Sequence, residues 1–478
     1  MMSKSQKTIN TASVSLFALV MLMTGAVDGI TNLPSIAIMG QQLVFFFIVA
    51  SLLFLLPTGL ISAELCKQYP EQGGVYAWSK RAWGGSMGAL VIWLQWINTM
   101  VWFPTCLMSL VGTVSYLINP QLSHNPLFLV GISLSMFWLM TWLNMKGVKQ
   151  STKIASWAST LGMLVPMVLI ISLSLLWIIL GKPLALQLNS TAIMPHLGHE
   201  STWTSLTAII TAFLGMELAT VHVKKIHNAH KIFPKAFIIS ILLIIFTMGV
   251  GSLSIALVMP HHKIVLVTGT IQAFSALFKG FHLSWLSDVV GFMLIFGSLG
   301  AMVNWLISPA NGLAQAAQDY YLPSYLAQEN QHGAPSKILI AQGIVVTFVC
   351  LAFFLMPSIN GSYWLLLDLS TELYVIMYLF MFLSALKLIP QLDNVTIIPG
   401  GKAAMTLVCL LGIIGCLITL VVGFFPPDQI DIGSPLHYSL LFTTGLLIMC
   451  SPALLLNYYQ TKTIKKLNSV VASSETKA

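Results

Sequence analysis

Charged residues are scarce in this sequence. Asp, Glu, Lys and Arg make up 8% of the 478 residues, while hydrophobic residues make up 57%. Ordinary soluble domains carry roughly 25% charged residues. So little charge excludes a soluble globular protein, because it leaves too few charged side chains for a hydrated surface.

The sequence also lacks the alternation of apolar and polar residues that membrane β-barrels show over ~10-residue segments. Its apolar runs are continuous instead, as at 44–61 and 236–259. A run of about 20 such residues crosses the ~30 Å hydrocarbon core of a bilayer as a helix. We therefore predict an all-α polytopic membrane protein.

Motifs of cofactor and metal chemistry are missing as well. The six cysteines have no paired spacing and no CxxC, so they indicate neither a disulfide framework nor a zinc site. The sequence contains no HExxH motif and no Walker glycine loop. His222, His227 and His230 are interpreted as the solvated face of a basic loop. We predict a protein that is not an enzyme and that binds no metal, cofactor or nucleic acid.

Apolar stretches bounded by charge, glycine or proline predict transmembrane helices. Twelve are expected, at about 13–40, 43–65, 86–118, 127–145, 156–181, 203–222, 236–259, 284–308, 337–356, 363–388, 402–425 and 436–458. The first is interpreted as a retained span, because the residues before it are too poor in positive charge for a secretion signal. With the N-terminus in the cytoplasm, every Lys and Arg except Lys182, Lys263 and Lys279 falls on the inner side. This bias predicts that both termini are cytoplasmic.

Two of the expected spans are interrupted. The first is broken between Gly25 and Pro34, and the sixth around Gly215 and Glu217. Lipid cannot satisfy the backbone groups that a break exposes, so such a break should line a cavity. The alternative is that the glycines only permit close helix packing.

Broken helices at equivalent positions of two repeats point to the central site of a transporter. We expect one transmembrane domain, 1–478, built as a five-plus-five inverted repeat with discontinuous helices 1 and 6. The halves would cover about 13–181 and 203–388, followed by helices 11 and 12 at about 402–458 and a cytoplasmic tail at 460–478.

Five acids lie within the predicted spans: Asp28, Glu217, Asp288, Asp368 and Glu372. An ionised carboxylate at bilayer depth is costly, so each should face the bundle interior or become neutral. Asp28 and Glu217 adjoin the breaks and are candidate substrate or proton groups. Asp288 and Asp368 lie near outer helix ends, where we expect water within reach and a structural role. Glu372, one turn deeper, is either a proton relay or a hydrogen-bonded helix contact.

Three aromatic residues are candidate binding groups. Tyr374 and Tyr378 are one turn apart, which places two hydroxyls on one face of the tenth span. Trp305 lies deep in the eighth span and is either a gate or a core aromatic.

Several stretches resemble the amino acid, polyamine and organocation transporter superfamily. The most specific is PEQGGVYAW at 70–78. The similarity to the bacterial glutamate/4-aminobutyrate antiporter family then runs over nearly the whole length, through LGMELATVHV at 214–223, SPANG at 308–312, LPSYLAQENQHGAPSKILIAQ at 322–342, IPGGK at 398–402 and FFPPDQI at 424–430. The resemblance implies the same inverted-repeat fold and a bacterial inner membrane.

The resemblance also implies roles for single residues. Glu217 matches the family's sixth-span glutamate, Tyr374 and Tyr378 match two tenth-span tyrosines, and Trp305 matches an eighth-span tryptophan. Some positions differ. Thr31, Asn32 and Leu33 stand where the family has Tyr-Glu-Tyr, Lys224 and Lys225 replace an Asn-Glu pair, and Asn311 replaces an arginine.

The sequence is best interpreted as an amino acid antiporter working by alternating access. The substrate carboxylate would lie at the first break, near Gly25, Ala26, Asp28, Gly29 and Thr31, because helix ends carry partial charge. The amino group would lie at Gly215–Glu217, with the three aromatic residues closing over the ligand. Two alternatives stay open: proton-coupled symport, with Glu217, Asp28 or Glu372 carrying the proton, and an amino acid sensor that no longer transports.

Overall fold

The bundle is built entirely of helices in the part of the chain that can be described. The computed structural model describes residues 16–27, 29–69, 74–146, 151–186, 194–195, 200–218, 229–319, 321–392, 396–425 and 430–475. The first six helices are α1 (Leu16–Val27), α2 (Leu33–Ala37), α3 (Leu43–Ala50), α4 (Leu56–Gln68), α5 (Val75–Trp83) and α6 (Gly85–Ile118). They are followed by α7 (Pro126–Met145), α8 (Ser151–Ile179), α10 (Glu200–Thr211), α11 (Ala229–Val258), α12 (Gly269–Gly280), α13 (Leu286–Gln318), α14 (Ser336–Cys350), α15 (Ile359–Leu388), α16 (Gly401–Val422) and α17 (Pro435–Glu475).

Eleven stretches of the described chain are long and apolar enough to cross a membrane. They coincide with eleven of the twelve expected spans. The expected sixth span is a shorter apolar helix, Leu206–Leu218, because the regular α-helix stops at Thr211. The residues after 218 lie outside the described ranges. The protein is thus an all-helical multi-pass membrane protein.

Local sequence chemistry explains where several helices begin. At the start of α7, the Asn125 side chain accepts a hydrogen bond from the amide of Phe128, and Pro126 occupies the first turn. At the start of α15, the Ser358 hydroxyl accepts from the amide of Gly361 at 2.9 Å. Both are helix N-caps, which satisfy amides that have no partner within the helix.

Three elements differ from the expected spans. The second span is not one regular helix, because a π-helical turn, Ser51–Leu55, separates α3 from α4. The short amphipathic helices α5 and α12 lie in stretches expected to be connections. π-Helical turns are often associated with functional positions. Neither apolar periodicity nor composition predicts the π-helical turn at Ser51–Leu55.

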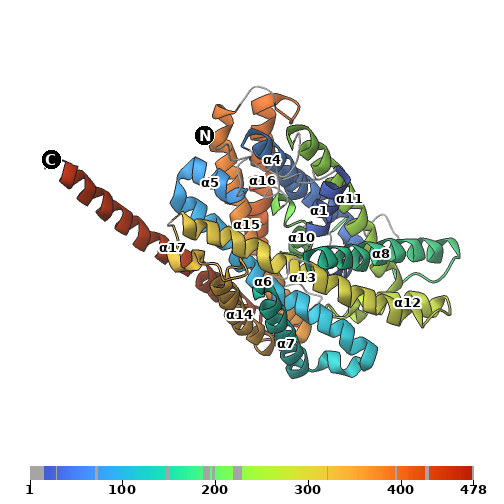
Figure 1. Ribbon diagram of the computed structural model, residues 1–478. Helices are drawn as coiled ribbons and strands as arrows, with labels where there is room; N and C mark the ends of the chain where they lie inside the picture. The colour runs from blue at the N-terminus through green and yellow to red at the C-terminus, as the bar shows by residue number, and fades with distance from the viewer. Residues whose placement is uncertain are drawn as a thin grey trace, which may run out of the picture.

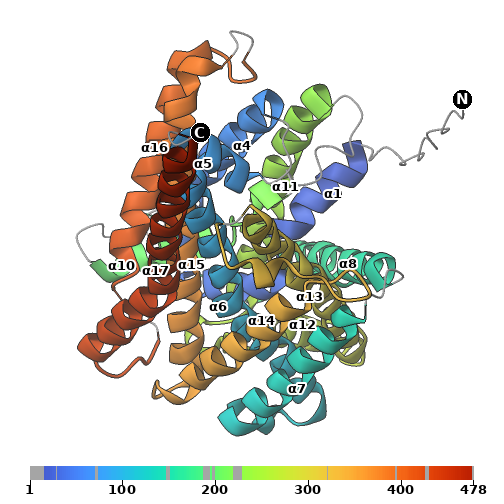
Figure 2. The ribbon, with the colours of Figure 1, turned by 60° about the vertical axis from the view of Figure 1, so that its left-hand side comes forward.

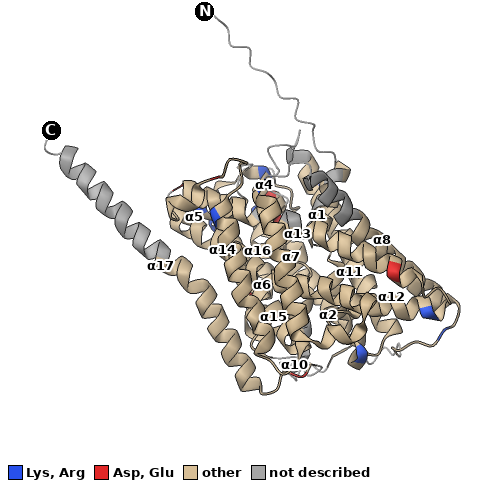
Figure 3. Ribbon diagram, turned by 60° about the horizontal axis from the view of Figure 1, so that its bottom comes forward, with Lys and Arg blue, Asp and Glu red and all other residues tan. Residues whose placement is uncertain are grey.

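The outer surface of the bundle is apolar. Large side chains on the lipid-facing sides are exposed, among them Phe246, Phe292, Phe348 and Leu447. Figure 3 shows a ribbon of the described chain almost free of charged segments. An apolar exterior is what a bilayer requires.

Helix contacts place the two broken helices next to the long central ones. α1 packs against α11, and α13 packs against both α8 and α6 (Figure 1). α15 packs against α6, α10, α16 and α17, and the last two lie on the side of the bundle away from α7 and α8 (Figure 2). Gly162 of α8 and Gly297 of α13 leave no room for a methyl group between them, so these two backbones meet directly.

Candidate functional site

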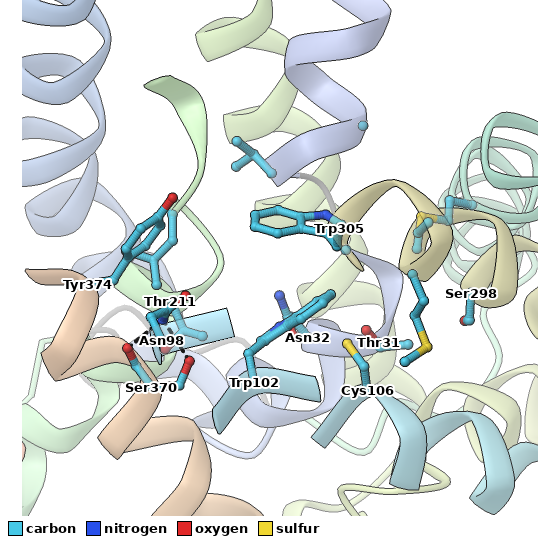
Figure 4. Close-up of a pocket in the computed structure, with 17 residues that line it drawn as sticks. Thr31, Asn32, Asn98, Trp102, Cys106, Thr211, Ser298, Trp305, Ser370 and Tyr374 are labelled. Carbon is cyan, nitrogen blue, oxygen red and sulfur yellow. Dashed lines mark hydrogen bonds between the residues drawn. The ribbon is translucent and has the colours of Figure 1, made fainter. Parts of the chain in front are cut away.

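A cavity lies at the level of both helix breaks, bounded by α1, α6, α8, α10, α13 and α15 (Figure 4). Its volume is about 50 Å³, several times the ~10–15 Å³ that one buried water needs on the same measure. The space therefore fits a ligand of a few heavy atoms. Its lining comprises Gly25, Val27, Gly29, Thr31, Asn32, Asn98, Trp102, Cys106, Met163, Thr211, Leu214, Ser298, Ala301, Met302, Trp305, Ser370 and Tyr374.

The first break is a true interruption of the helix. α1 ends at Val27, and Gly29 is extended, with φ −97° and ψ 106°. A 3₁₀ turn at Ile30–Asn32 then leads into α2. The amide of Asn32 donates to the carbonyl of Gly29 at 2.9 Å. The start of a helix leaves its first amides without partners in the helix, so this break presents backbone donors next to the cavity.

Helix packing does not explain the two glycines that mark the breaks. A Cβ on Gly25 would meet nothing within 4 Å. Gly215 has φ +102°, a conformation that side chains with a Cβ rarely adopt. Gly25 is therefore not a packing glycine, and Gly215 is required by the turn that ends the helical segment.

Glu217 lies in a closed hydrogen-bonded cluster beside the cavity. Its carboxylate accepts from Gln95 Nε2 at 2.9 Å, from the Tyr374 hydroxyl at 2.5 Å and from the Tyr378 hydroxyl. The Tyr378 hydroxyl also accepts from the amide of Gly215 at 2.9 Å. These contacts join the α10 break to α6 and α15. The cluster, called below the Glu217 cluster, comprises Gln95, Gly215, Glu217, Tyr374 and Tyr378.

One face of α6 contributes Asn98, Trp102 and Cys106 to the cavity wall. Gln95, Asn98, Trp102 and Cys106 follow one another at intervals of three and four residues, which keeps them on one side of the helix. Asn98 Nδ2 donates to the carbonyl of Ser370 at 2.6 Å and to its hydroxyl at 2.9 Å. Sequence reasoning missed this face. The signal was an amide pair inside an apolar span, followed by an aromatic residue at helical spacing.

Two tryptophans meet over the cavity. The rings of Trp102 from α6 and Trp305 from α13 have centroids 5.2 Å apart and are tilted by 42° (Figure 4). Tilted pairs at this distance are attractive. Trp305 is thus at the cavity surface rather than in the packed core.

Apart from Asp288, Asp368 and Glu372, the residues singled out from the sequence fall into three groups. Gly25, Gly29, Thr31, Trp305 and Tyr374 line the cavity. Gly215, Glu217 and Tyr378 belong to the Glu217 cluster, with Tyr374 shared between the cluster and the cavity. The third group lies outside the described part of the structure: Asp28, His222 and His227, and the side chains of Ala26 and His230.

Two acids of α15 lie away from the cavity. Asp368 is only 1% exposed, and the Tyr438 hydroxyl donates to it. The expectation that water reaches Asp368 was wrong, because α17 covers it. Glu372 is fully buried, and neither of its oxygens has a hydrogen-bond partner among the described residues. The hydrogen-bonded helix contact considered for Glu372 is therefore not formed with any of the described residues. Asp288 is exposed at the start of α13, as expected.

The cavity wall carries no ionisable group apart from Cys106 and Tyr374 among the residues placed around it. No group of three or more His, Cys, Asp or Glu side chains that could hold a metal occurs within the described ranges. Among the described lining residues, helix ends and neutral dipoles are the groups that face a charge on a ligand.

A charged contact outside the membrane joins α5 to the end of α13. Asp319 accepts from Lys80 Nζ at 2.7 Å and from the Tyr76 hydroxyl at 2.5 Å. Burial alone would raise the pKa of Asp319, but the hydrogen bonds from Lys80 and Tyr76 outweigh burial and hold that pKa below its ordinary value. Burial, and then the Asp319 carboxylate, raise the pKa of Tyr76.

Comparison with known sequences identifies the protein family. The pattern of the family described as amino acid permease matches residues 14–447. The chain belongs to the amino acid permease family. It is therefore a membrane transporter for amino acids and not an enzyme, and the resemblance seen in its motifs is confirmed.

Individual relatives agree with this assignment. An uncharacterized transporter of Legionella pneumophila is 37% identical over 94% of this chain and 96% of its own length. A glutamate/gamma-aminobutyrate antiporter of Lactococcus lactis is 29% identical over 88% of this chain and 86% of its own. A probable agmatine/putrescine antiporter of the same species is 23% identical over 86% of this chain and 88% of its own.

Proposed function

We propose that this permease exchanges small amino acids of zero net charge, 4-aminobutyrate among the candidates, by alternating access. The observation that carries the proposal is the small cavity between the α1 break and the cluster at the α10 break, with no charged side chain among the residues that line it. A zwitterion needs one positive and one negative partner, and opposed helix ends supply both.

The carboxylate end of the substrate would bind at the α1 break. Ile30 and Thr31 begin a helical stretch that continues into α2. Their amides have no partners within that stretch, and the start of a helix carries partial positive charge. Thr31 also lines the cavity, where its hydroxyl is hydrogen-bonded to the Cys106 thiol and would turn to the carboxylate when substrate binds. This assignment keeps the role proposed for Gly25, Ala26, Asp28 and Gly29 as the frame of the carboxylate site.

The amino end would bind opposite, at the α10 break. Thr211 and Leu214 line the cavity where α10 ends, and the C-terminal end of a helix carries partial negative charge. Glu217 stands one layer back, behind Tyr374. Three donors already occupy the Glu217 carboxylate. Glu217 therefore attracts the ammonium group across the intervening Tyr374, or directly once the Tyr374 side chain has rotated away.

Alternating access would be driven by rearrangement of the broken helices against α6, α13 and α15. The Glu217 cluster ties the α10 break to two of these helices, and Trp102 with Trp305 closes one side of the cavity. We propose that the first five and the next five membrane spans are the two inverted halves. They form one domain together with α16, α17 and the tail. The bias of Lys and Arg supports cytoplasmic termini in a bacterial inner membrane.

The relatives bear on the choice of substrate. One acts on glutamate and gamma-aminobutyrate and another, by its name, on agmatine and putrescine. Without a charged side chain in the described wall, a substrate with a net charge would enter the cavity uncompensated, which is costly. We therefore place zwitterions ahead of glutamate and of diamines.

Counterflow in liposomes tests this proposal. Purified protein is reconstituted with an unlabelled amino acid inside, and uptake of labelled 4-aminobutyrate, neutral amino acids, glutamate and putrescine is followed. An exchanger shows uptake only with internal substrate. Uptake that follows a pH gradient without internal substrate would make the protein a symporter. Binding without any uptake would make it a sensor.

A further inference from the structure

α15 carries a second polar surface, on the side opposite to the cavity. Ser370 and Tyr374 face the cavity. Asp368 and Glu372 are each displaced by two residues from these, which is about 200° around an α-helix. The two acids are one turn apart and share a face. They cannot touch a ligand in the cavity, yet they lie on the same helix as the residues that line it.

Helices α16 and α17 enclose these acids. The Tyr438 hydroxyl, in the first turn of α17, donates to Asp368 Oδ2. Gly423, which caps the end of α16, lies so close to Glu372 that a methyl group there would overlap Glu372 Oε1. Glycine at 423 thus makes the space that the carboxyl group occupies.

The acid pair has almost no partners. Neither oxygen of Glu372 makes a hydrogen bond to a described residue, and the described partners of Asp368 are Tyr438 and the neighbouring Trp364 indole. Among the described residues, the titratable groups beside the pair are Tyr438 from α17 and Cys416 from α16. α6 and α10 meet this stretch of α15 through the neutral side chains of Asn98 and Thr211. Within the described ranges, no Lys, Arg or His forms an ion pair with either acid.

Two ionised carboxylates without a cation would be very unfavourable in this environment. Burial and like-charge repulsion both favour the neutral form. A protonated carboxyl group needs no counter-ion. A hard divalent cation is a poorer fit, since it takes about six or more oxygen ligands and the pair with Tyr438 offers few.

We propose that Asp368 and Glu372 form a proton-binding site, separate from the substrate cavity, that gains and loses a proton during the transport cycle. When substrate moves inward, a proton taken from outer water by a carboxylate oxygen of Glu372 passes to inner water, and the pair returns with the outgoing substrate carrying one proton fewer. In the proposed orientation the site lies toward the outer face, where α16 ends and α17 begins. The coupling to substrate movement rests on the proposed transport function, whereas proton binding does not.

The first test measures protons moved per substrate. Liposomes containing a pH-sensitive dye report proton flux during exchange of a labelled substrate by the wild type and by Glu372→Gln, Asp368→Asn and the double variant. Glutamine resembles a protonated glutamate in shape, so folding should survive. We expect the variants to move about one proton fewer per substrate and to keep counterflow within about threefold of wild type. An unchanged ratio in both single variants would overturn the proposal.

Glu64→Gln is the matched control. Glu64 is also a fully buried acid, but its oxygens accept from Gln68 Nε2 at 3.1 Å and from the amide of Ile397 at 2.6 Å. Its carboxylate is therefore satisfied where it lies. Its replacement should leave the proton ratio unchanged. The same loss of a proton in Glu64→Gln would mean that any buried acid gives this result, and the site assignment would fall.

A second test reads protonation without transport. Infrared spectra of the purified protein show a carboxyl C=O band for protonated acids, and part of this band should disappear in Glu372→Gln. A band unchanged in the double variant refutes the proposal. If sodium stabilises the wild type but not Glu372→Gln, the site binds a cation instead, which also refutes it. Loss of the band in a protein that transports nothing would leave the proton site standing and reject the proposed transport function.

Discussion

Replacement of Glu217 by glutamine tests the Glu217 cluster at its centre. Glu217 accepts hydrogen bonds from Gln95, Tyr374 and Tyr378. Glutamine has almost the same shape but offers one oxygen and one donating NH₂ group, so one hydroxyl donor faces another donor. Hydrogen bonds to a charged group are worth ~1.5–3 kcal/mol, against ~0.5–1.5 kcal/mol for neutral ones. A loss of ~1 kcal/mol at each of three bonds gives about 3 kcal/mol.

Part of that energy is lost equally in every conformation in which the cluster is formed. If about 2 kcal/mol is lost selectively in the conformations that bind and move substrate, the exchange rate falls about 30-fold, since ~1.4 kcal/mol corresponds to a factor of ten. The protein should still insert and fold, because the volume at residue 217 hardly changes.

Initial rates of counterflow in liposomes measure the effect, and size-exclusion chromatography of the detergent-solubilised protein checks folding. Glu64→Gln serves as the control for loss of a buried acid outside the cavity and should exchange at nearly the wild-type rate. Wild-type kinetics in Glu217→Gln would refute the reasoning and leave Glu217 with a purely structural role.

Three further outcomes are expected. Tyr378→Phe removes the donor to Glu217 and the acceptor for the Gly215 amide, so it should weaken substrate binding by ~1–3 kcal/mol. Tyr378→Ala also removes the ring, whose centroid lies 5.1 Å from that of Phe54, and should reduce turnover more. Equal kinetics in the two variants would show that the ring is dispensable. Asp319→Asn should cost ~0.2–1 kcal/mol near neutral pH, because the ion pair is partly exposed. The pKa of Asp319 in the folded protein is lowered, so the stability difference between wild type and Asp319→Asn should shrink as pH falls through that pKa. Melting temperatures of the two proteins that differ equally at neutral and acidic pH would contradict the assignment. Truncation after Lys462 should leave the pH dependence of uptake between about pH 4.5 and 8 unchanged. The removed tail has no histidine to titrate in this range and no aromatic residue to fill a pore. A truncated protein newly active at neutral pH would show that the tail blocks the transport path.

The breaks were the most predictable part of the structure. Glycine and proline at bilayer depth weaken a helix for local reasons, and Gly25, Gly29 and Gly215 all lie where the helices stop. Continuous apolar runs marked the long helices equally well. Both signals depend on the residues themselves and need no knowledge of neighbouring elements.

Features that depend on tertiary contacts were harder to predict. The sequence marks Asp368 as an acid near a helix end, but α17 folds over it and excludes water. It also marks Glu217 as a candidate substrate or proton group, and only the structure shows that Tyr374, which donates to Glu217, lines the cavity beside it. The spacing of Gln95 and Asn98 predicts that they share one face of α6. That this face packs against α15 follows only from the structure, in which Asn98 donates to Ser370.

The central claim is that substrate occupies the cavity between the broken α1 and helices α6, α13 and α15. Cys106 provides a native probe, because it lines this cavity, whereas Cys350 is buried elsewhere. Alkylation of each thiol by a small maleimide is followed in versions that keep only that cysteine, with and without a saturating exchanged amino acid. The account predicts that substrate slows modification of Cys106 at least about tenfold and leaves Cys350 unaffected. A substrate that raises the melting temperature but does not change the Cys106 rate would contradict it.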